Sequence, residues 1–334
     1  MRRLALLVVA GVAASGCATG LVAAGPGAAA RNAALPGGGK VVARMGISPG
    51  SGGFAVGVGA VWAMSDAGPT LTRIDPARNG VVARIKLVPR NQCPAVPPGC
   101  GEVAAGNAAV WVSHSMDDTV SRIDPVTNRV VATIEVGSHP DGIAVSPGAV
   151  WVANSGDPSV SRIDPTTNRV VAKIRVGPAS ACCSDSMQLT AGVGGVWVAV
   201  PTLNAVARLD PATNTVTARI RLSARPDGFL AADKSAVWVA AAHSAPVVWR
   251  IDPKSNKPIE AVKRLAVPIG LALGFGSLWV AELDSKMIER VNARTARIVG
   301  RLRVGGYPAH LGVGFGSVWV RDDTGRVLRI QPQE

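Results

Sequence analysis

The sequence predicts an all-β protein, a seven-bladed β-propeller with four-stranded antiparallel blades. Three observations predict it: a tryptophan recurs at nearly constant spacing, a strand-rich unit surrounds each tryptophan, and the two ends of the repeat array supply complementary parts of one unit. The chain has 334 residues, of which 48% are hydrophobic and 17% are charged. At about 150 residues per domain this length suggests two domains. The repeats override that estimate, because a closed array can be longer than an ordinary domain.

Seven tryptophans mark the repeat. They are separated by 49, 40, 46, 41, 41 and 40 residues, and they are Trp62, Trp111, Trp151, Trp197, Trp238, Trp279 and Trp319. Residues 110–130, 150–170 and 196–216 align around three of them without a gap. A period of about 40 residues with four strand-like segments is typical of propeller blades. We therefore expect each tryptophan to pack in the core between neighbouring blades.

Residues 140–177 show one complete unit. The expected strands, from the axis outward, are 140–145, 150–153, 159–163 and 169–176. Residues 164–168 read Asp-Pro-Thr-Thr-Asn, which predicts a hairpin turn because proline presets φ and the flanking Asp and Asn accept turn hydrogen bonds. The abundance of valine and isoleucine supports the strand assignment.

The two ends of the array complete one blade. The last repeat stops after its third strand, at residues 329–332, whereas residues 40–46 precede the first innermost strand. Lys40-Val41-Val42-Ala43-Arg44-Met45 matches the outermost strand that begins Arg169-Val170-Val171. We expect this amino-terminal strand to close the last blade and so to leave no unpaired sheet edge at the join.

The first residues have the pattern of an export signal. Arg2 and Arg3 precede an apolar run over residues 4–14, and Ala14-Ser15-Gly16-Cys17 follows. This run is too short for a membrane-spanning helix and is typical of a signal peptide. The small-small-Cys ending resembles the lipobox of bacterial lipoproteins, although Ala14 replaces the usual leucine. The resemblance implies lipidation at Cys17. The alternative is ordinary secretion, with Cys17 in the discarded peptide.

The resulting organisation is a signal peptide (1–16), a flexible Ala/Gly-rich tether (17–39) and the propeller (40–334). The formal net charge is +13, and the arginines are spread through the repeats without a cluster. These arginines are either solvated residues on the rim, or they attract the protein weakly to an anionic cell envelope. We expect no nucleic-acid partner, because exported proteins rarely meet nucleic acid.

The repeats resemble a known family. The units P-x-G-I-A-V, G-x-V-W-V-A-N and S-R-I-D-P-x-T-N-R-V-V are similar to bacterial YVTN-repeat, YncE-like propellers and to the wider virginiamycin B lyase-like (streptogramin lyase) group. For the lyase, the resemblance would imply a Pro-His-Gly-Ile strand start, a catalytic acidic group and a bound magnesium ion. Here the corresponding starts are Pro140-Asp141-Gly142, Pro226-Asp227-Gly228, Pro268-Ile269-Gly270 and Pro308-Ala309-His310, none of which reads Pro-His-Gly. The lyase site is therefore not transferred to this chain.

One face of the ring carries the variable loops, and variable loops on a rigid scaffold are where binding sites usually lie. All four histidines map there. Twelve acids join them, and these are Asp66, Glu102, Asp117, Asp118, Asp141, Asp157, Asp185, Asp227, Glu282, Asp284, Asp322 and Asp323. The candidate ligand-binding residues flank the starts of the innermost strands and are His139, Asp141, Arg225, Asp227, Tyr307 and His310, with His114 and Glu282 in second place. No catalytic or metal-ligating residue is assigned.

Two insertions on the same face contain the remaining cysteines. In an oxidising compartment we expect local pairing of Cys93 with Cys100, which would stabilise the fold by about 2–3 kcal/mol, and a vicinal disulfide between Cys182 and Cys183. Cross-linking between the two insertions is the alternative pairing.

Two functions follow. The first is a ligand-binding or protein-interaction scaffold at the cell envelope, with a small molecule, a peptide or an envelope polymer as its partner and no cofactor. Membrane contact would be through the lipid anchor alone. The alternative is a lyase or hydrolase of the virginiamycin B lyase-like kind, for which a divalent metal is conceivable. A histidine within about 3 Å of a carboxylate in the central funnel would favour the alternative.

Overall fold

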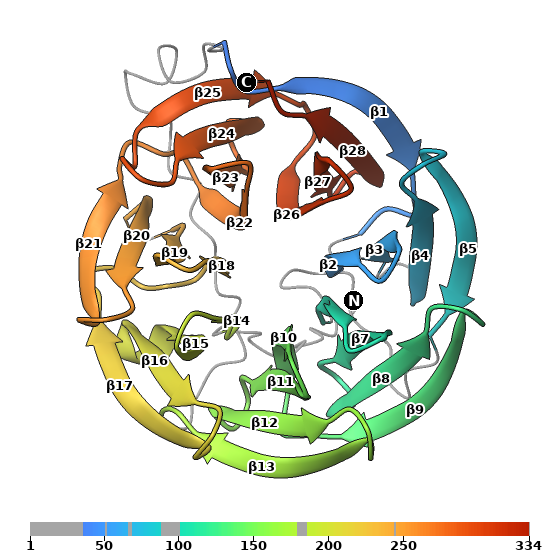
Figure 1. Ribbon diagram of the computed structural model, residues 1–334, viewed down its shortest axis with the longest axis vertical. Coiled ribbons are helices and arrows are strands. Elements are labelled where there is room, and N and C mark those ends of the chain that lie inside the picture. The colour runs from blue at the N-terminus through green and yellow to red at the C-terminus, as the bar shows by residue number, and fades with distance from the viewer. Residues whose placement is uncertain are drawn as a thin grey trace, which may run out of the picture.

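Seven four-stranded antiparallel sheets surround a central axis, which confirms the predicted propeller (Figure 1). The computed structural model describes residues 36–50, 52–65, 69–87, 101–178, 186–243 and 245–333. Within these ranges the only helical element is a single 3-10 turn, η1 (Pro201–Leu203). Accordingly, no helix in the described part of the chain is long and apolar enough to cross a membrane.

The blades follow one another in chain order, and each runs from the axis outward. Blades 1 to 4 consist of β2 (Phe54–Gly57), β3 (Ala60–Ser65), β4 (Thr70–Asp75) and β5 (Gly80–Lys86); β6 (Val103–Gly106), β7 (Ala109–His114), β8 (Thr119–Asp124) and β9 (Arg129–Glu135); β10 (Pro140–Ser146), β11 (Ala149–Asn154), β12 (Ser159–Asp164) and β13 (Arg169–Arg175); β14 (Leu189–Gly192), β15 (Gly195–Val200), β16 (Ala205–Asp210) and β17 (Thr215–Arg221). Blades 5 to 7 consist of β18 (Leu230–Ala232), β19 (Val237–Ala241), β20 (Val247–Asp252) and β21 (Lys257–Val262); β22 (Pro268–Gly274), β23 (Ser277–Glu282), β24 (Met287–Asn292) and β25 (Ile298–Arg303); β26 (Pro308–Gly314), β27 (Ser317–Asp322), β28 (Arg326–Gln331) and β1 (Lys40–Gly46).

The amino-terminal strand closes the ring, as predicted. β1 pairs antiparallel with β28, with Lys40 opposite Gln331 and Gly46 opposite Arg326. Blade 7 therefore takes three strands from the carboxyl end and its outermost strand from the amino end (Figure 1).

The core lies between adjacent blades. Every residue of the second strands β3, β7, β11, β15, β19, β23 and β27 is buried. The seven repeat tryptophans are fully buried, and Trp151 of blade 3 packs in one cluster with Val196 and Val198 of blade 4. The expectation that each tryptophan packs between blades is thus confirmed by the structure.

A repeated arginine links each tryptophan to the next blade. In all seven blades the third-strand arginine stacks over its own tryptophan, with its guanidinium carbon 4.9–5.6 Å from the ring centroid. In blade 3, Arg162 also donates to the carbonyl oxygen of Pro211 at 2.8 Å and to Asn214 Oδ1 at 2.7 Å, both in the hairpin turn of blade 4. Asn214 has φ +56°, a left-handed conformation that asparagine tolerates. The same two bonds are made by Arg73, Arg122, Arg208 and Arg329.

Two blades depart from this pattern. Arg290 of blade 6 donates to the carbonyl oxygens of Gly37 and Gln333, so it joins the two ends of the ring. Arg250 of blade 5 stacks on Trp238, but within the described residues no hydrogen bond ties it to the next turn. In that turn, alanines at 293 and 296 replace the usual proline and asparagine.

The outer rim is protected against edge-to-edge pairing. Each outermost strand contains a register irregularity. Each also carries lysine or arginine, whereas Glu135 and Glu260 are the only acidic residues within these strands. Bulges and cations are known means of protecting exposed sheet edges, so much of the net positive charge is explained by the rim.

Candidate functional site

Seven structurally equivalent side chains form an apolar ring in the central channel. Each lies on an innermost strand, opposite the residue that follows the repeat tryptophan. They are Phe54, Val103, Ile143, Leu189, Leu230, Leu271 and Leu311. The ring lines a cavity of about 140 Å³ to which every blade contributes.

The residue immediately before each ring position divides the blades into two groups. Blades 1, 3 and 6 have glycine there, at Gly53, Gly142 and Gly270. Blades 2, 4, 5 and 7 have Glu102, Gln188, Phe229 and His310, and all four side chains line the same cavity. We call these four side chains the mouth residues.

The glycines let neighbouring innermost strands come close together. A Cβ on Gly53 would lie 2.3 Å from the backbone nitrogen of Val103, and one on Gly270 would lie 2.4 Å from the carbonyl oxygen of Ala309. These distances are too short for any side chain. Gly53 N instead donates to Gly101 O at 3.2 Å, which fixes the strand that carries Glu102.

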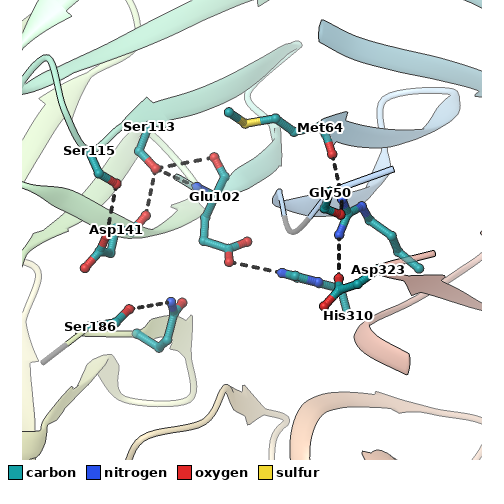
Figure 2. A network of polar contacts seen from close by, with 11 residues as sticks. Gly50, Met64, Glu102, Ser113, Ser115, Asp141, Ser186, His310 and Asp323 are labelled. Atoms are coloured by element: carbon teal, nitrogen blue, oxygen red, sulfur yellow. Dashed lines mark hydrogen bonds and ion pairs between the residues drawn. The ribbon is translucent and has the colours of Figure 1, made fainter. Parts of the chain in front are cut away.

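A histidine and a carboxylate meet across the channel. His310 Nε2 of blade 7 lies 3.2 Å from Glu102 Oε1 of blade 2 (Figure 2). The side chains are 10% and 14% exposed, so both are largely withdrawn from solvent. The ring of Phe229, from blade 5, packs edge-on against the imidazole with centroids 5.0 Å apart. Three blades thus converge on His310.

The second ring nitrogen of His310 has no hydrogen-bond partner within the described part of the chain, although it is buried. A carboxylate accepts hydrogen bonds, so the Nε2 that faces Glu102 carries the proton. In a neutral imidazole the other nitrogen, Nδ1, is then an acceptor. Because buried polar atoms in native proteins usually have partners, this nitrogen marks a place where a ligand or a water molecule can bind.

Asp141 lies beside Glu102 and is held by serines. It accepts hydrogen bonds from Ser115 Oγ at 3.0 Å and from Ser155 Oγ. Burial raises the pKa of the Asp141 carboxyl, and the negative charge of Glu102 raises it further, while the serine hydrogen bonds oppose the shift. The serine Ser113 connects the two acids, since it accepts from Glu102 N at 2.8 Å and donates to Asp141 O at 2.7 Å (Figure 2).

Asp323 lies on the other side of His310. Burial raises the pKa of its carboxyl, although His310, in its protonated form, and Arg321 act against this. Arg321 is fully buried and donates to Asp323 Oδ1 at 3.2 Å, to Met64 O at 3.0 Å and to the carbonyl oxygen of Gly50. Its charge is therefore used inside the wall of the channel.

The remaining candidate residues on the variable face lie outside the cavity lining. His139 has φ +49°, and its Nδ1 contacts Ser138 Oγ at 3.1 Å. Asp227 accepts from Ala242 N at 2.6 Å and lies 3.0 Å from the Nδ1 of His243.

These contacts shift two pKa values. Burial opposes ionisation of Asp227, but the hydrogen bonds from His243 and Ala242 outweigh it and lower the pKa of the carboxyl. The hydrogen bond between Asp227 and His243 also raises the pKa of the His243 imidazole. Arg225 lies in the loop before Asp227, and the exposed Tyr307 ring has Lys286 Nζ 4.8 Å from its centroid.

The two second-place candidates occupy the ends of second strands. His114 Nε2 contacts Ser121 Oγ at 2.8 Å, and burial lowers the pKa of its imidazole. Glu282 accepts from Ala266 N at 3.1 Å and from Ser285 Oγ at 3.0 Å. His114 thus contacts the neighbouring strand β8, whereas Glu282 supports neighbouring loops. Among the eight candidates only His310 lines the cavity described above.

The five cysteines, Cys17, Cys93, Cys100, Cys182 and Cys183, lie outside the described residues, so lipidation and disulfide pairing stay predictions. Most of both insertions lies outside as well. In the portion that the structure does describe, no three His, Cys, Asp or Glu side chains are grouped so that they could hold a metal ion.

Sequence reasoning missed Glu102, Gln188 and Phe229 as site residues. A signal for them exists in the repeat itself. When the innermost strands are aligned on the tryptophan, the position before the apolar ring reads Gly, Glu, Gly, Gln, Phe, Gly, His. Four copies have a large polar or aromatic side chain at a position where three copies have glycine. This difference between copies marks the position as a candidate site in the sequence.

The structure is similar to other propellers of low sequence identity. Virginiamycin B lyase from Staphylococcus aureus matches with a TM-score of 0.69 and 15% identity, over 87% of this chain and 99% of that chain. Kuenenia stuttgartiensis hydrazine synthase matches with a TM-score of 0.67 and 15% identity, over 85% and 96%. BamB from Moraxella catarrhalis matches with a TM-score of 0.59 and 16% identity, over 84% and 85%.

At these identities the matches show the shared fold alone. No family model matches the sequence, and no curated protein matches it. Function therefore has to be argued from the channel and its side chains.

Proposed function

We propose that the protein binds a small molecule at the mouth of the central channel, with the apolar part of the ligand in the ring cavity and its polar group among the mouth residues. The observation that carries this is the one-position difference between blades, since four large side chains converge where three blades have glycine. A pre-formed concave site with a few convergent polar groups is the usual form of a small-molecule site.

The cavity sets the size of the buried part of the ligand. Its volume is about 140 Å³, close to the roughly 150 Å³ of an apolar cavity that holds one benzene molecule. A single six-membered ring or a short branched aliphatic group fits this space. Larger ligands would extend from the mouth across the variable face.

A thermal-shift screen on the full chain tests the proposal, with benzyl alcohol, benzylamine and benzoate as probes and with or without divalent metal ions. A probe at 100 times its Kd stabilises the folded state by about 2.7 kcal/mol and raises the Tm. The rise should disappear in Phe229→Ala and persist in the control Tyr307→Ala, whose side chain lies on the same face outside the cavity lining. If no probe at millimolar concentration raises the Tm, or if Phe229→Ala keeps the rise, the proposal is wrong.

A lyase or hydrolase is the second candidate, and the 3.2 Å contact between His310 and Glu102 is the observation that favours it. A carboxylate in contact with a histidine can orient the imidazole and stabilise its charged form when it acts as a general base. Virginiamycin B is the natural first substrate to try. Product mass in heavy-oxygen water separates the two reactions, because a hydrolase incorporates solvent oxygen and a lyase does not. Turnover that survives in His310→Ala would contradict this assignment.

We further propose that the protein is exported and lipid-anchored at the envelope through Cys17, where the channel mouth would serve as a ligand-binding or interaction surface. The support is the charged, apolar and small-residue pattern of residues 1–17. Labelled palmitate should be incorporated into the wild-type chain in a bacterial host and not into Cys17→Ser. Equal labelling of both chains would refute the anchor.

A further inference from the structure

We propose that the ligand of the mouth is an organic cation, a protonated amine attached to a ring or a short aliphatic group. This inference rests on the small-molecule site proposed above and names the chemical class of its ligand. Three features support it: the hydrogen-bonding state of His310, the balance of charges around the channel, and the aromatic wall of the cavity.

The unpartnered Nδ1 of His310 favours a ligand that donates a hydrogen bond. In the neutral imidazole, the Nε2 of His310 that faces the Glu102 carboxylate carries the proton, which leaves Nδ1 as a buried acceptor without a partner among the described residues. The whole residue is only 9% exposed. An ammonium group presents three donors and no acceptor. It can therefore satisfy Nδ1 and a carboxylate oxygen at once.

The charged side chains around the channel also favour a cationic ligand. Glu102 lines the cavity, Asp141 lies close enough to repel it, and Asp323 interacts with His310 from the opposite side. The buried cation nearest to them, Arg321, already donates to Asp323 and to two backbone carbonyl oxygens.

Cations of the variable face are engaged further out. His243 contacts Asp227, and Lys286 lies over Tyr307. An anionic ligand would meet the Glu102 carboxylate in the cavity lining, with the carboxyl groups of Asp141 and Asp323 behind the lining, whereas a cation would be attracted to all three.

The wall of the cavity suits the body of such a ligand. Phe229 lines the cavity beside His310, and below it lies the apolar ring. Ammonium groups are attracted to aromatic rings, and more strongly when both are withdrawn from water. A ligand with its ring among Leu230, Leu271 and Leu311 would bring its ammonium group to Glu102 and His310.

The raised pKa values of Asp141 and Asp323 add a pH dependence. A bound cation stabilises the ionised form of each carboxylate, so binding releases protons. Affinity for an amine should therefore rise over the pH range in which these two carboxyl groups lose their protons.

Calorimetric titration of the full chain with benzylamine, benzyl alcohol and benzoate tests the inference. We expect benzylamine to bind at least about tenfold more tightly than benzyl alcohol, because charge-assisted hydrogen bonds are roughly twice as strong as neutral ones, and benzoate to bind most weakly. Glu102→Gln should remove the preference for the amine and leave the affinity for the alcohol within about twofold. Asp227→Asn, an acid on the same face outside the cavity lining, should leave both affinities unchanged.

The outcomes separate the two proposals. If benzyl alcohol binds as tightly as benzylamine, or benzoate more tightly, the cation inference fails while the small-molecule site stands. If none of the three probes binds, both fail. The comparison of charged and neutral probes is made on the wild-type protein, so it remains decisive even if Glu102→Gln does not fold.

Discussion

Replacing Arg162 should weaken the ring more than replacing Arg250, although both arginines stack on a repeat tryptophan. The Arg162 guanidinium carbon lies 5.2 Å from the centroid of Trp151, and that of Arg250 lies 5.6 Å from the centroid of Trp238. Only Arg162 also donates two hydrogen bonds to the hairpin turn of the following blade, at 2.8 Å and 2.7 Å. The pair therefore separates stacking from the contact between blades.

The structure gives the expected magnitudes. Stacking of a partly exposed cation on an aromatic ring is worth about 0.5–1 kcal/mol, so Arg250→Ala should lower the free energy of unfolding by about 1 kcal/mol once lost packing is included. Hydrogen bonds to charged groups contribute about 1.5–3 kcal/mol. The two acceptors lie at the rim and can form hydrogen bonds with water once the arginine is removed, so the lower end of this energy range applies. Arg162→Ala should then cost about 2–3 kcal/mol in all.

Equilibrium unfolding in urea measures both variants, and unfolding rates give the same ordering if the transition is irreversible. A double-mutant cycle with Asn214→Gly isolates the bond to the turn, because glycine keeps the left-handed backbone at φ +56° and removes only the side-chain acceptor. We expect a coupling energy of about 1 kcal/mol. Equal destabilisation by the two arginine replacements, together with a coupling near zero, would refute the view that these bonds hold the blades together.

Two further predictions concern the scaffold. Burial, followed by the nearby Glu282, raises the pKa of Glu289 to about 7, so in the native state Glu289 keeps a proton that the unfolded chain loses near its ordinary value of 4.5. The free energy of unfolding should fall by up to about 3 kcal/mol as the pH rises from 4.5 to about 7. Urea titrations at several pH values measure this dependence. Glu289→Gln should flatten it, whereas the exposed control Glu260→Gln should not. Gly270→Ala should lower stability by about 1–3 kcal/mol, because its Cβ would meet Ala309 O at 2.4 Å, whereas Gly46→Ala, with open space around it, should change the urea midpoint little; similar losses in both would contradict the close-packing argument.

Much of the architecture was predictable because the repeat is regular. The tryptophan spacing determined the number of blades, and the match between residues 40–45 and 169–174 predicted the closure that β1 and β28 show. The S-R-I-D-P-x-T-N sequence predicted the hairpin. Its arginine, however, reaches the next blade, and a contact between copies cannot be found within a single copy.

The site was harder to predict because the innermost strands begin irregularly. In a regular strand, successive side chains face opposite sides, so two neighbours would not both point into the channel. The register shifts between Pro308 and His310, and between Pro268 and Gly270. In blade 7 both His310 and Leu311 nevertheless line the cavity, and so do the corresponding neighbours in blades 2, 4 and 5. His139 lies one residue before a strand that also begins with proline, but its carbonyl oxygen accepts from Ser155 N and its ring contacts Ser138.

The contacts of Arg290 also show on which face of the propeller the two ends of the ring lie. This guanidinium contacts Gly37 and Gln333, at the level where the equivalent arginines reach the hairpin turns. Both ends of the ring therefore emerge beside the hairpins, while the innermost strands begin, and the cavity opens, on the opposite side. Coupling the protein to a bead or a sensor chip through a residue beside Gly37 or Gln333 should leave the opening of the cavity facing the solution.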